Sequence, residues 1–162
     1  LHAAVGLAQV RKLDTFLAIQ KKNHAALKNI LAQVPEVSFR VLPDVEGDSC
    51  TFLCWFLPTE AQTVAFVNEM KAQGILPGNF YWYANNWHYI KQWQHLKTAG
   101  SLYNLNEDQK AALLKLQTTE FAASDAVMNR CICTSISLLW TEEQIAEKGA
   151  KMVAAINKAL GK

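Results

Sequence analysis

A helical pattern of apolar residues occupies the first part of the chain and sets the strongest limit on its fold. From Leu13 to Val34, apolar side chains recur at spacings of three and four residues, and Pro35 follows directly. That spacing predicts an amphipathic helix over residues 1–34, and proline, which lacks a backbone N–H, predicts where the helix ends. At about 1.5 Å per residue such a helix spans about 50 Å, which is long for one compact domain. We therefore expect a bend near Gly6.

The start of this helix lacks a capping residue. Leu1 already belongs to the apolar pattern, and no Ser, Thr, Asp or Asn precedes it to accept a hydrogen bond from the first turn. The sequence also begins without an initiating Met. We therefore expect the chain to be the C-terminal part of a longer protein, with further residues upstream of Leu1.

Composition limits the class of protein. The 162 residues are 51% hydrophobic and 19% charged, which is the balance of a globular domain. The net charge of +2 comes from Lys and Arg residues scattered along the sequence, so the basic stripe typical of nucleic-acid-binding proteins is missing. No apolar run in the sequence approaches the ~20 residues that span a bilayer. We expect a cytoplasmic protein whose partners include neither nucleic acid nor membrane.

Helices and strands are predicted along the rest of the chain without any internal repeat. Apolar runs between turn residues predict strands over 37–42, 50–57 and 130–139. Periodicity predicts helices over 60–73, 107–117 and 142–160, and a short one over 88–98. The three longer helices each have a capping residue followed by Gln at the third position: Thr59 with Gln62, Asn106 with Gln109, and Thr141 with Gln144. Few strands and segregated helices predict an α+β fold, a small antiparallel sheet packed with helices.

Four cysteines occur as two pairs, Cys50 with Cys54 and Cys131 with Cys133. Their spacings, C-x-x-x-C and C-x-C, differ from the C-x-x-C of short structural zinc loops. If each pair lies in a strand, its two side chains share one face of the sheet. We interpret the four as small buried hydrophobic residues, and a metal site or a disulfide is the alternative.

Complete catalytic motifs are missing from the sequence. It contains no glycine-rich phosphate loop, no nucleophile elbow and no H-E-x-x-H. The histidines lie far apart along the chain, and we interpret His2, His24 and His95 as structural or solvated side chains.

Three stretches nevertheless resemble one enzyme family. They are LHAAVGLAQVRKLD at 1–14, QGILP at 73–77 and SISLLWTEEQI at 135–145. They are similar to the helix after the active-site loop, the "GI" strand entry and the "SLPL…TEEQI" run of the vitamin-B6-dependent sugar aminotransferases, the DegT/StrS family. The three stretches occur in the family's order and span nearly the whole chain.

The resemblance implies a fold-type-I aminotransferase whose larger N-terminal domain holds pyridoxal 5'-phosphate on a lysine upstream of Leu1. This chain would be the C-terminal small domain, with residues 1–34 as a long connecting helix and residues 35–162 as an α+β body. It would contain no catalytic, cofactor-binding or metal-binding residue and would be inactive alone. The intact enzyme would be a homodimer that moves an amino group, usually from glutamate, to a keto sugar or sugar acid for cell-surface polysaccharide such as lipopolysaccharide. Within the family we expect the subgroup that makes 8-amino octulosonic acid.

The aromatic segment 79–89 supplies the candidate substrate-binding residues. It combines flat rings with hydrogen-bonding groups, which suits the C–H faces and the hydroxyl rim of a sugar. The candidates are Tyr81, Tyr83, Asn85, Asn86 and His88. His88 is the nearest match to the histidine of the family's "PLH" segment, although the Pro and Leu of that segment are missing here. The alternative is that the rings of this segment, Phe80, Trp82 and Trp87, belong to the core.

Two other functions stay open. The chain could be a free-standing carbohydrate-binding or interaction module that uses the same aromatic segment, or a purely structural dimerisation domain. The proline of the family's "SLPL" run is replaced here by Ser137, which leaves the identity of the sugar open.

Overall fold

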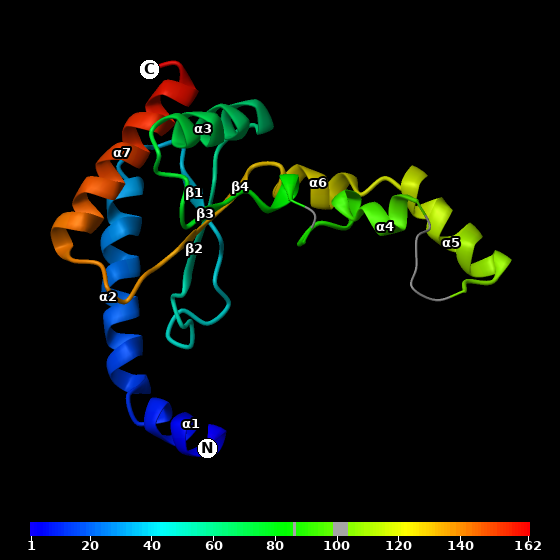
Figure 1. Ribbon diagram of the computed structural model, residues 1–162. Coiled ribbons are helices and arrows are strands. Elements are labelled where there is room, and N and C mark those ends of the chain that lie inside the picture. The colour runs from blue at the N-terminus through cyan, green and yellow to red at the C-terminus, as the bar shows by residue number, and fades with distance from the viewer. Residues whose placement is uncertain (86, 99–103) are drawn as a thin grey trace.

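A small antiparallel sheet is the centre of the fold. The computed structural model describes residues 1–85, 87–98 and 104–162, and within them four strands form an open sheet in the order β1-β2-β4-β3 (Figure 1). The strands are β1 (Ser38–Phe39), β2 (Phe52–Phe56), β3 (Asn79–Phe80) and β4 (Cys131–Ser135). The two longest, β2 and β4, pair at the centre, with Cys54 directly opposite Cys133. The fold is therefore α+β, as the sequence predicted.

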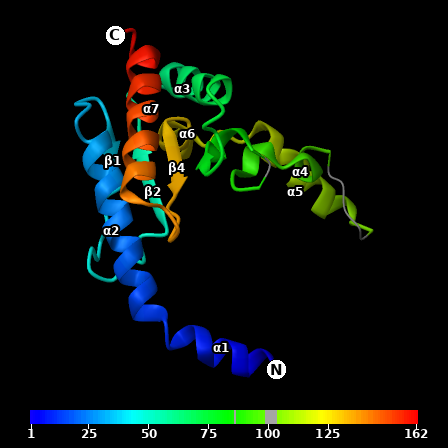
Figure 2. The ribbon, with the colours of Figure 1, turned by 60° about the vertical axis from the view of Figure 1, so that its left-hand side comes forward.

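Three helices pack together on one face of this sheet. They are α2 (Leu13–Leu31), α3 (Glu60–Ala72) and α7 (Glu142–Leu160) (Figure 1, Figure 2). Because side chains alternate along a strand, every second residue of β2 and β4 points toward these helices. Leu53, Trp55 and Ile132 do so and are at most 2% exposed. The Trp55 ring meets the edge of the Phe66 ring of α3, with centroids 5.1 Å apart.

A buried polar chain crosses the sheet beneath these helices. Trp55 Nε1 donates to Thr134 Oγ1 over 3.1 Å, and the same hydroxyl donates to Asn79 Oδ1 over 2.6 Å. The Asn79 amide nitrogen in turn donates to the backbone oxygen of Ile75. These contacts connect β2, β4 and β3, so they also fix the start of the segment that follows β3.

The first predicted helix is two helices. α1 (His2–Val10) and α2 meet near Lys12 and run in different directions (Figure 2). The prediction of one helix over residues 1–34 with a bend near Gly6 was wrong, since Gly6 lies inside α1 and α2 ends at Leu31. The physical reason is packing: α1 buries none of its residues, whereas α2 buries several against the sheet and α7.

The predicted capping residues start the long helices. Thr59, Asn106 and Thr141 each accept a hydrogen bond from the backbone N–H three residues on, at the starts of α3, α5 (Glu107–Thr118) and α7. At Asn106 and Thr141 the glutamine side chain returns the hydrogen bond, which completes both capping boxes. These starts are confirmed to within a residue.

The strands are shorter than predicted. The ranges 50–57 and 130–139 contract to β2 and β4, and 37–42 contracts to β1. At the start of β2 the cause is local, because Cys50 has a φ of 56°, a left-handed conformation that an extended strand does not contain. Cys50 therefore lies outside the sheet and does not share a face with Cys54, contrary to the prediction.

An arm of short helices projects from the β3 side of the sheet (Figure 1, Figure 2). It contains η1 (Trp82–Ala84), η2 (Ile90–Gln92), α4 (Gln94–Lys97), α5 and α6 (Ala122–Met128). The helix predicted over 88–98 is divided between η2 and α4, and α6 was not predicted. None of the helices in the described part of the chain combines the length and the apolar character needed to cross a bilayer.

Side-chain contacts fix the base of this arm. The Tyr81 hydroxyl donates to the backbone oxygen of Asn129 over 2.9 Å. The carboxylate of Asp125 in α6 accepts hydrogen bonds from the Tyr89 hydroxyl and the Lys91 ammonium group. The segment after β3 is therefore held against the segment before β4.

Candidate functional site

The second face of the sheet lies away from α2, α3 and α7 and contains a pocket. Alternation along the strands places Phe52, Cys54 and Cys133 on this face, opposite the buried set of Leu53, Trp55 and Ile132. The pocket has a volume of about 450 Å³. It is lined by Arg40, Asp48, Thr51, Phe52, Cys54, Trp82, His88 and Cys133.

Trp82 and His88 form one wall of the pocket, and Phe80 packs against Trp82. The Phe80 and Trp82 rings are parallel, with centroids 4.6 Å apart and an interplanar angle of 2°. The His88 imidazole also contacts the indole, with ring centroids 3.8 Å apart and an interplanar angle of 38°. A flat apolar surface and an exposed imidazole are thereby placed side by side.

A local turn presents His88 to the pocket. The side-chain oxygen of Asn85 accepts hydrogen bonds from the backbone N–H groups of Trp87, over 2.9 Å, and His88, over 3.3 Å. Asparagine favours turns because its side chain satisfies the backbone two and three residues on in this way. Asn85 therefore positions His88.

Arg40 supplies the positive charge of the pocket. Its backbone N–H donates to the Cys54 carbonyl, which continues the pairing of β1 with β2 and fixes the Cα position. The guanidinium group is half exposed, and its Nη2 lies 4.0 Å from Asp48 Oδ2, a loose ion pair. Such a group keeps most of its five N–H donors available to an anionic ligand.

Thiols form the floor of the pocket. Cys54 Sγ and Cys133 Sγ lie 3.1 Å apart, and all four cysteines are free thiols. Hydrogen bonds from Cys131 and Cys133 lower the pKa of Cys54, whereas hydrogen bonds to the other two sulfurs and burial raise the pKa of Cys131. The prediction of small buried residues holds for Cys50, Cys131 and Cys133, while Cys54 is only partly buried.

Comparison with known proteins decides the family. The sequence model of the DegT/DnrJ/EryC1/StrS aminotransferase family matches residues 1–153. The chain belongs to this family. The match covers the whole sheet, the arm and most of α7, and it confirms at family level the resemblance seen in the sequence. Aminotransferases of this family generally depend on pyridoxal phosphate.

The pocket of this DegT-family chain does not fit the reactive part of that cofactor. Pyridoxal phosphate reacts through a Schiff base with a lysine. The residues that line the pocket include an arginine and a histidine but no lysine. We therefore assign no step of the cofactor's chemistry to these residues.

The structure separates the five predicted site residues. His88 lines the pocket, and Asn85 supports it from the adjacent turn. Tyr81 and Tyr83 face the arm: Tyr81 binds the backbone of Asn129, and the Tyr83 ring lies 5.1 Å from the Tyr89 ring. Burial raises the pKa of Tyr81 to about 12, so its hydroxyl stays protonated. Asn86 lies outside the described residues.

Phe80, Trp82 and Trp87, which the alternative interpretation assigned to the core, lie outside it. Phe80 is 36% exposed and Trp87 is 75% exposed, while Trp82 is partly buried and lines the pocket. That alternative was therefore wrong. The sequence analysis also missed Arg40 and Thr51, which enter the site only because the pairing of β1 with β2 brings residues 40 and 51–54 together. No spacing in the sequence signals that juxtaposition.

Proposed function

We propose that this chain is the C-terminal small domain of a pyridoxal-phosphate-dependent enzyme that transfers an amino group from glutamate to a keto sugar acid for cell-surface polysaccharide. Residues 1–34 connect it to a cofactor domain upstream of Leu1, and the enzyme acts as a cytoplasmic homodimer. Family membership supports the reaction class. The observation that supports the substrate is the pocket in which Arg40, Trp82 and His88 meet.

Each part of the pocket suits one part of a sugar acid. The Phe52 and Trp82 rings, which line the pocket, suit the C–H groups of a pyranose. The His88 imidazole and the Thr51 hydroxyl can each donate to or accept from sugar hydroxyls. The Arg40 guanidinium can bind a carboxylate through two parallel hydrogen bonds, which favours an acid such as an octulosonic acid over a neutral sugar.

Binding by the chain itself tests the substrate class. We expect calorimetric titration with 3-deoxy-octulosonic acid to detect binding that Arg40→Gln weakens by roughly tenfold or more, since a hydrogen bond to a charged group contributes about 1.5–3 kcal/mol. The methyl ester of the same sugar should bind wild type and Arg40→Gln alike. His88→Gln should weaken both ligands, whereas the matched surface variants Arg11→Gln and His2→Gln should change neither. Equal loss of acid and ester in Arg40→Gln would contradict the carboxylate assignment.

A second measurement tests the absence of turnover in the isolated chain. With pyridoxal phosphate, glutamate and a keto sugar acid, we expect no amino sugar. Borohydride should trap no stoichiometric adduct at a single lysine. The same assay on the polypeptide that joins this chain to its upstream lysine-bearing domain should give product. Turnover by the chain alone would refute the proposed division of labour between the domains.

A further inference from the structure

We propose that His24, Asp48 and Cys50 form a binding site for a divalent transition-metal ion of the zinc class. One nitrogen, one oxygen and one sulfur ligand atom of these residues all lie within 4.8 Å of one another. They come from two elements, α2 and the loop between β1 and β2. The site does not depend on the function proposed above.

His24 is the ligand on the rigid element. It lies in the middle of α2, its side chain is only 8% exposed, and its imidazole makes no hydrogen bond to any residue in the described part of the chain. Burial lowers the pKa of His24, which favours the neutral ring with a free lone pair. A buried imidazole without a partner, facing a carboxylate and a thiol, is what a metal ligand requires.

Asp48 supplies an oxygen that lacks a hydrogen-bond partner. Its Oδ1 accepts from the Cys50 backbone N–H over 3.3 Å, but its Oδ2 is fully buried and accepts no hydrogen bond. The Arg40 guanidinium 4.0 Å away is too distant to provide one. An unpaired buried carboxylate oxygen is unfavourable, and a bound cation would remove that penalty.

Cys50 is held in an unusual backbone conformation. Among the described residues, Cys50 is the one residue other than glycine with a positive φ, which is 56°. Strain of this kind persists where the surrounding structure or a function requires it, and here it brings the thiol next to Asp48 and His24. The thiol now donates to the Asp48 backbone oxygen over 3.7 Å. Binding of a metal ion would release that proton to solvent and leave a thiolate ligand.

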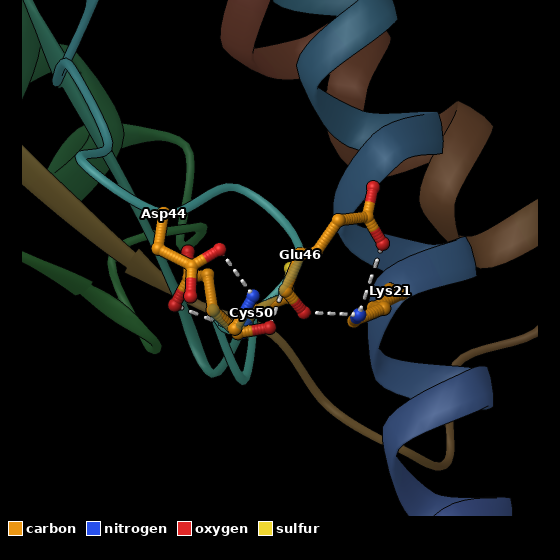
Figure 3. Close-up of polar contacts among 6 residues, drawn as sticks. Lys21, Asp44, Glu46 and Cys50 are labelled. Atoms are coloured by element: carbon orange, nitrogen blue, oxygen red, sulfur yellow. Dashed lines mark hydrogen bonds and ion pairs between the residues drawn. The ribbon is translucent and has the colours of Figure 1, made fainter.

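The loop that contains two of the ligands is already fastened to α2. Lys21 donates to the Glu46 backbone oxygen over 2.7 Å and lies 3.9 Å from its carboxylate. The Asp44 carboxylate accepts from the Gly47 backbone N–H over 2.9 Å. Figure 3 shows Lys21 pointing from the helix to Glu46, with Asp44 and Cys50 on the same loop. The ligands are therefore preorganised before any ion binds.

Three cationic side chains lie near the site, and their positions permit a metal ion. Lys21 is occupied by Glu46, and the Lys28 ammonium lies over the Phe39 ring, 5.3 Å from its centroid. Only Arg40 faces Asp48, and its loose contact would be replaced by the ion. Imidazole and thiolate ligands favour Zn²⁺ or Co²⁺ over Mg²⁺ and Ca²⁺, and water would complete the tetrahedron.

Cobalt provides the spectroscopic test. Titration of the chain with Co²⁺ should give one equivalent of binding, visible tetrahedral d–d bands and a near-ultraviolet thiolate-to-cobalt band, all displaced by Zn²⁺. Cys50→Ser should abolish the thiolate band, and His24→Gln and Asp48→Asn should weaken Co²⁺ binding by about tenfold or more. The matched controls Cys131→Ser and His2→Gln should bind as wild type does.

The outcomes separate this site from other thiols of the chain. Loss of the thiolate band in Cys133→Ser but not in Cys50→Ser would place the ion at the Cys54–Cys133 pair and overturn the proposal. An unchanged affinity in His24→Gln would also overturn it. Because Asp48→Asn could disturb the loop, thermal melts provide an independent measure: Zn²⁺ should raise the melting temperature of wild type and Cys131→Ser, and leave that of Cys50→Ser unchanged.

Discussion

Thr134→Val tests whether the buried polar chain across the sheet stabilises the fold. Valine has nearly the shape of threonine, so the substitution removes one hydroxyl and leaves the packing of this fully buried position unchanged. The loss leaves Trp55 Nε1 without its acceptor at 3.1 Å and Asn79 Oδ1 without its donor at 2.6 Å. Each buried group left unsatisfied costs about 1–3 kcal/mol, so we expect the free energy of unfolding to fall by roughly 2–5 kcal/mol.

Urea denaturation followed by tryptophan fluorescence measures this change. The matched control is Thr134→Ser, which keeps the hydroxyl and removes one methyl group, worth about 1 kcal/mol. The Val variant should therefore unfold at clearly lower urea than the Ser variant, with an unchanged dependence on urea concentration. If Thr134→Val and Thr134→Ser lower the free energy of unfolding equally, the hydrogen bonds do not stabilise the fold and the reasoning is wrong. In Thr134→Val we also expect weaker sugar-acid binding, because Asn79 fixes the segment that positions Trp82.

Three further changes follow from single contacts. Gly149→Ala should lower the free energy of unfolding by about 1–3 kcal/mol despite the better helix propensity of alanine, because the new Cβ would lie 2.7 Å from Ile30 Cδ1. Urea denaturation measures this loss, and adding Ile30→Val, which removes that Cδ1, should restore part of it. Hydrogen peroxide should join Cys54 and Cys133 in a disulfide, since their sulfurs lie 3.1 Å apart in a directly opposed pair; mass spectrometry should find this cross-link, and Cys133→Ser should lack it. Hydrogen bonds from Lys91 and Tyr89 lower the pKa of Asp125 below its ordinary 3.8, so their contribution to stability is present above about pH 4 and is lost as the pH falls through the lower pKa of the folded state. Amide hydrogen exchange at the base of the arm should become faster in that acid range. In Asp125→Asn the exchange rate should show no such increase.

Features with a local cause could be predicted from the sequence. The starts of α3, α5 and α7 follow from a capping side chain and a glutamine three residues on, and both partners lie within one turn. The fold class follows from the order of apolar runs and periodic segments. The family resemblance also depends on contiguous residues, and the family match over 1–153 confirms it.

Features that depend on tertiary contacts could not be predicted in this way. The chain turns near Lys12 because α2 is packed and α1 is not, and no proline or glycine at residues 9–15 marks that point in the sequence. Arg40 reaches the pocket through strand pairing, and Cys50 leaves the strand through a left-handed backbone. The pattern of aromatic residues gave no sign that His88 would line the pocket while Tyr81 would face the arm, and the role of these residues in substrate binding stays a prediction.

The brevity of β1 and β3 has a consequence for solubility. Both outer strands of the sheet are two residues long, so each outer edge presents a very short row of backbone groups to another molecule. Long unpaired edges are templates for strand addition and fibril growth, and short ones are a common natural safeguard. In this chain β1 pairs only with Trp55 and Phe56 of β2, and β3 only with Cys133 and Thr134 of β4, so the two outer strands themselves give lateral sheet extension between copies little to begin from.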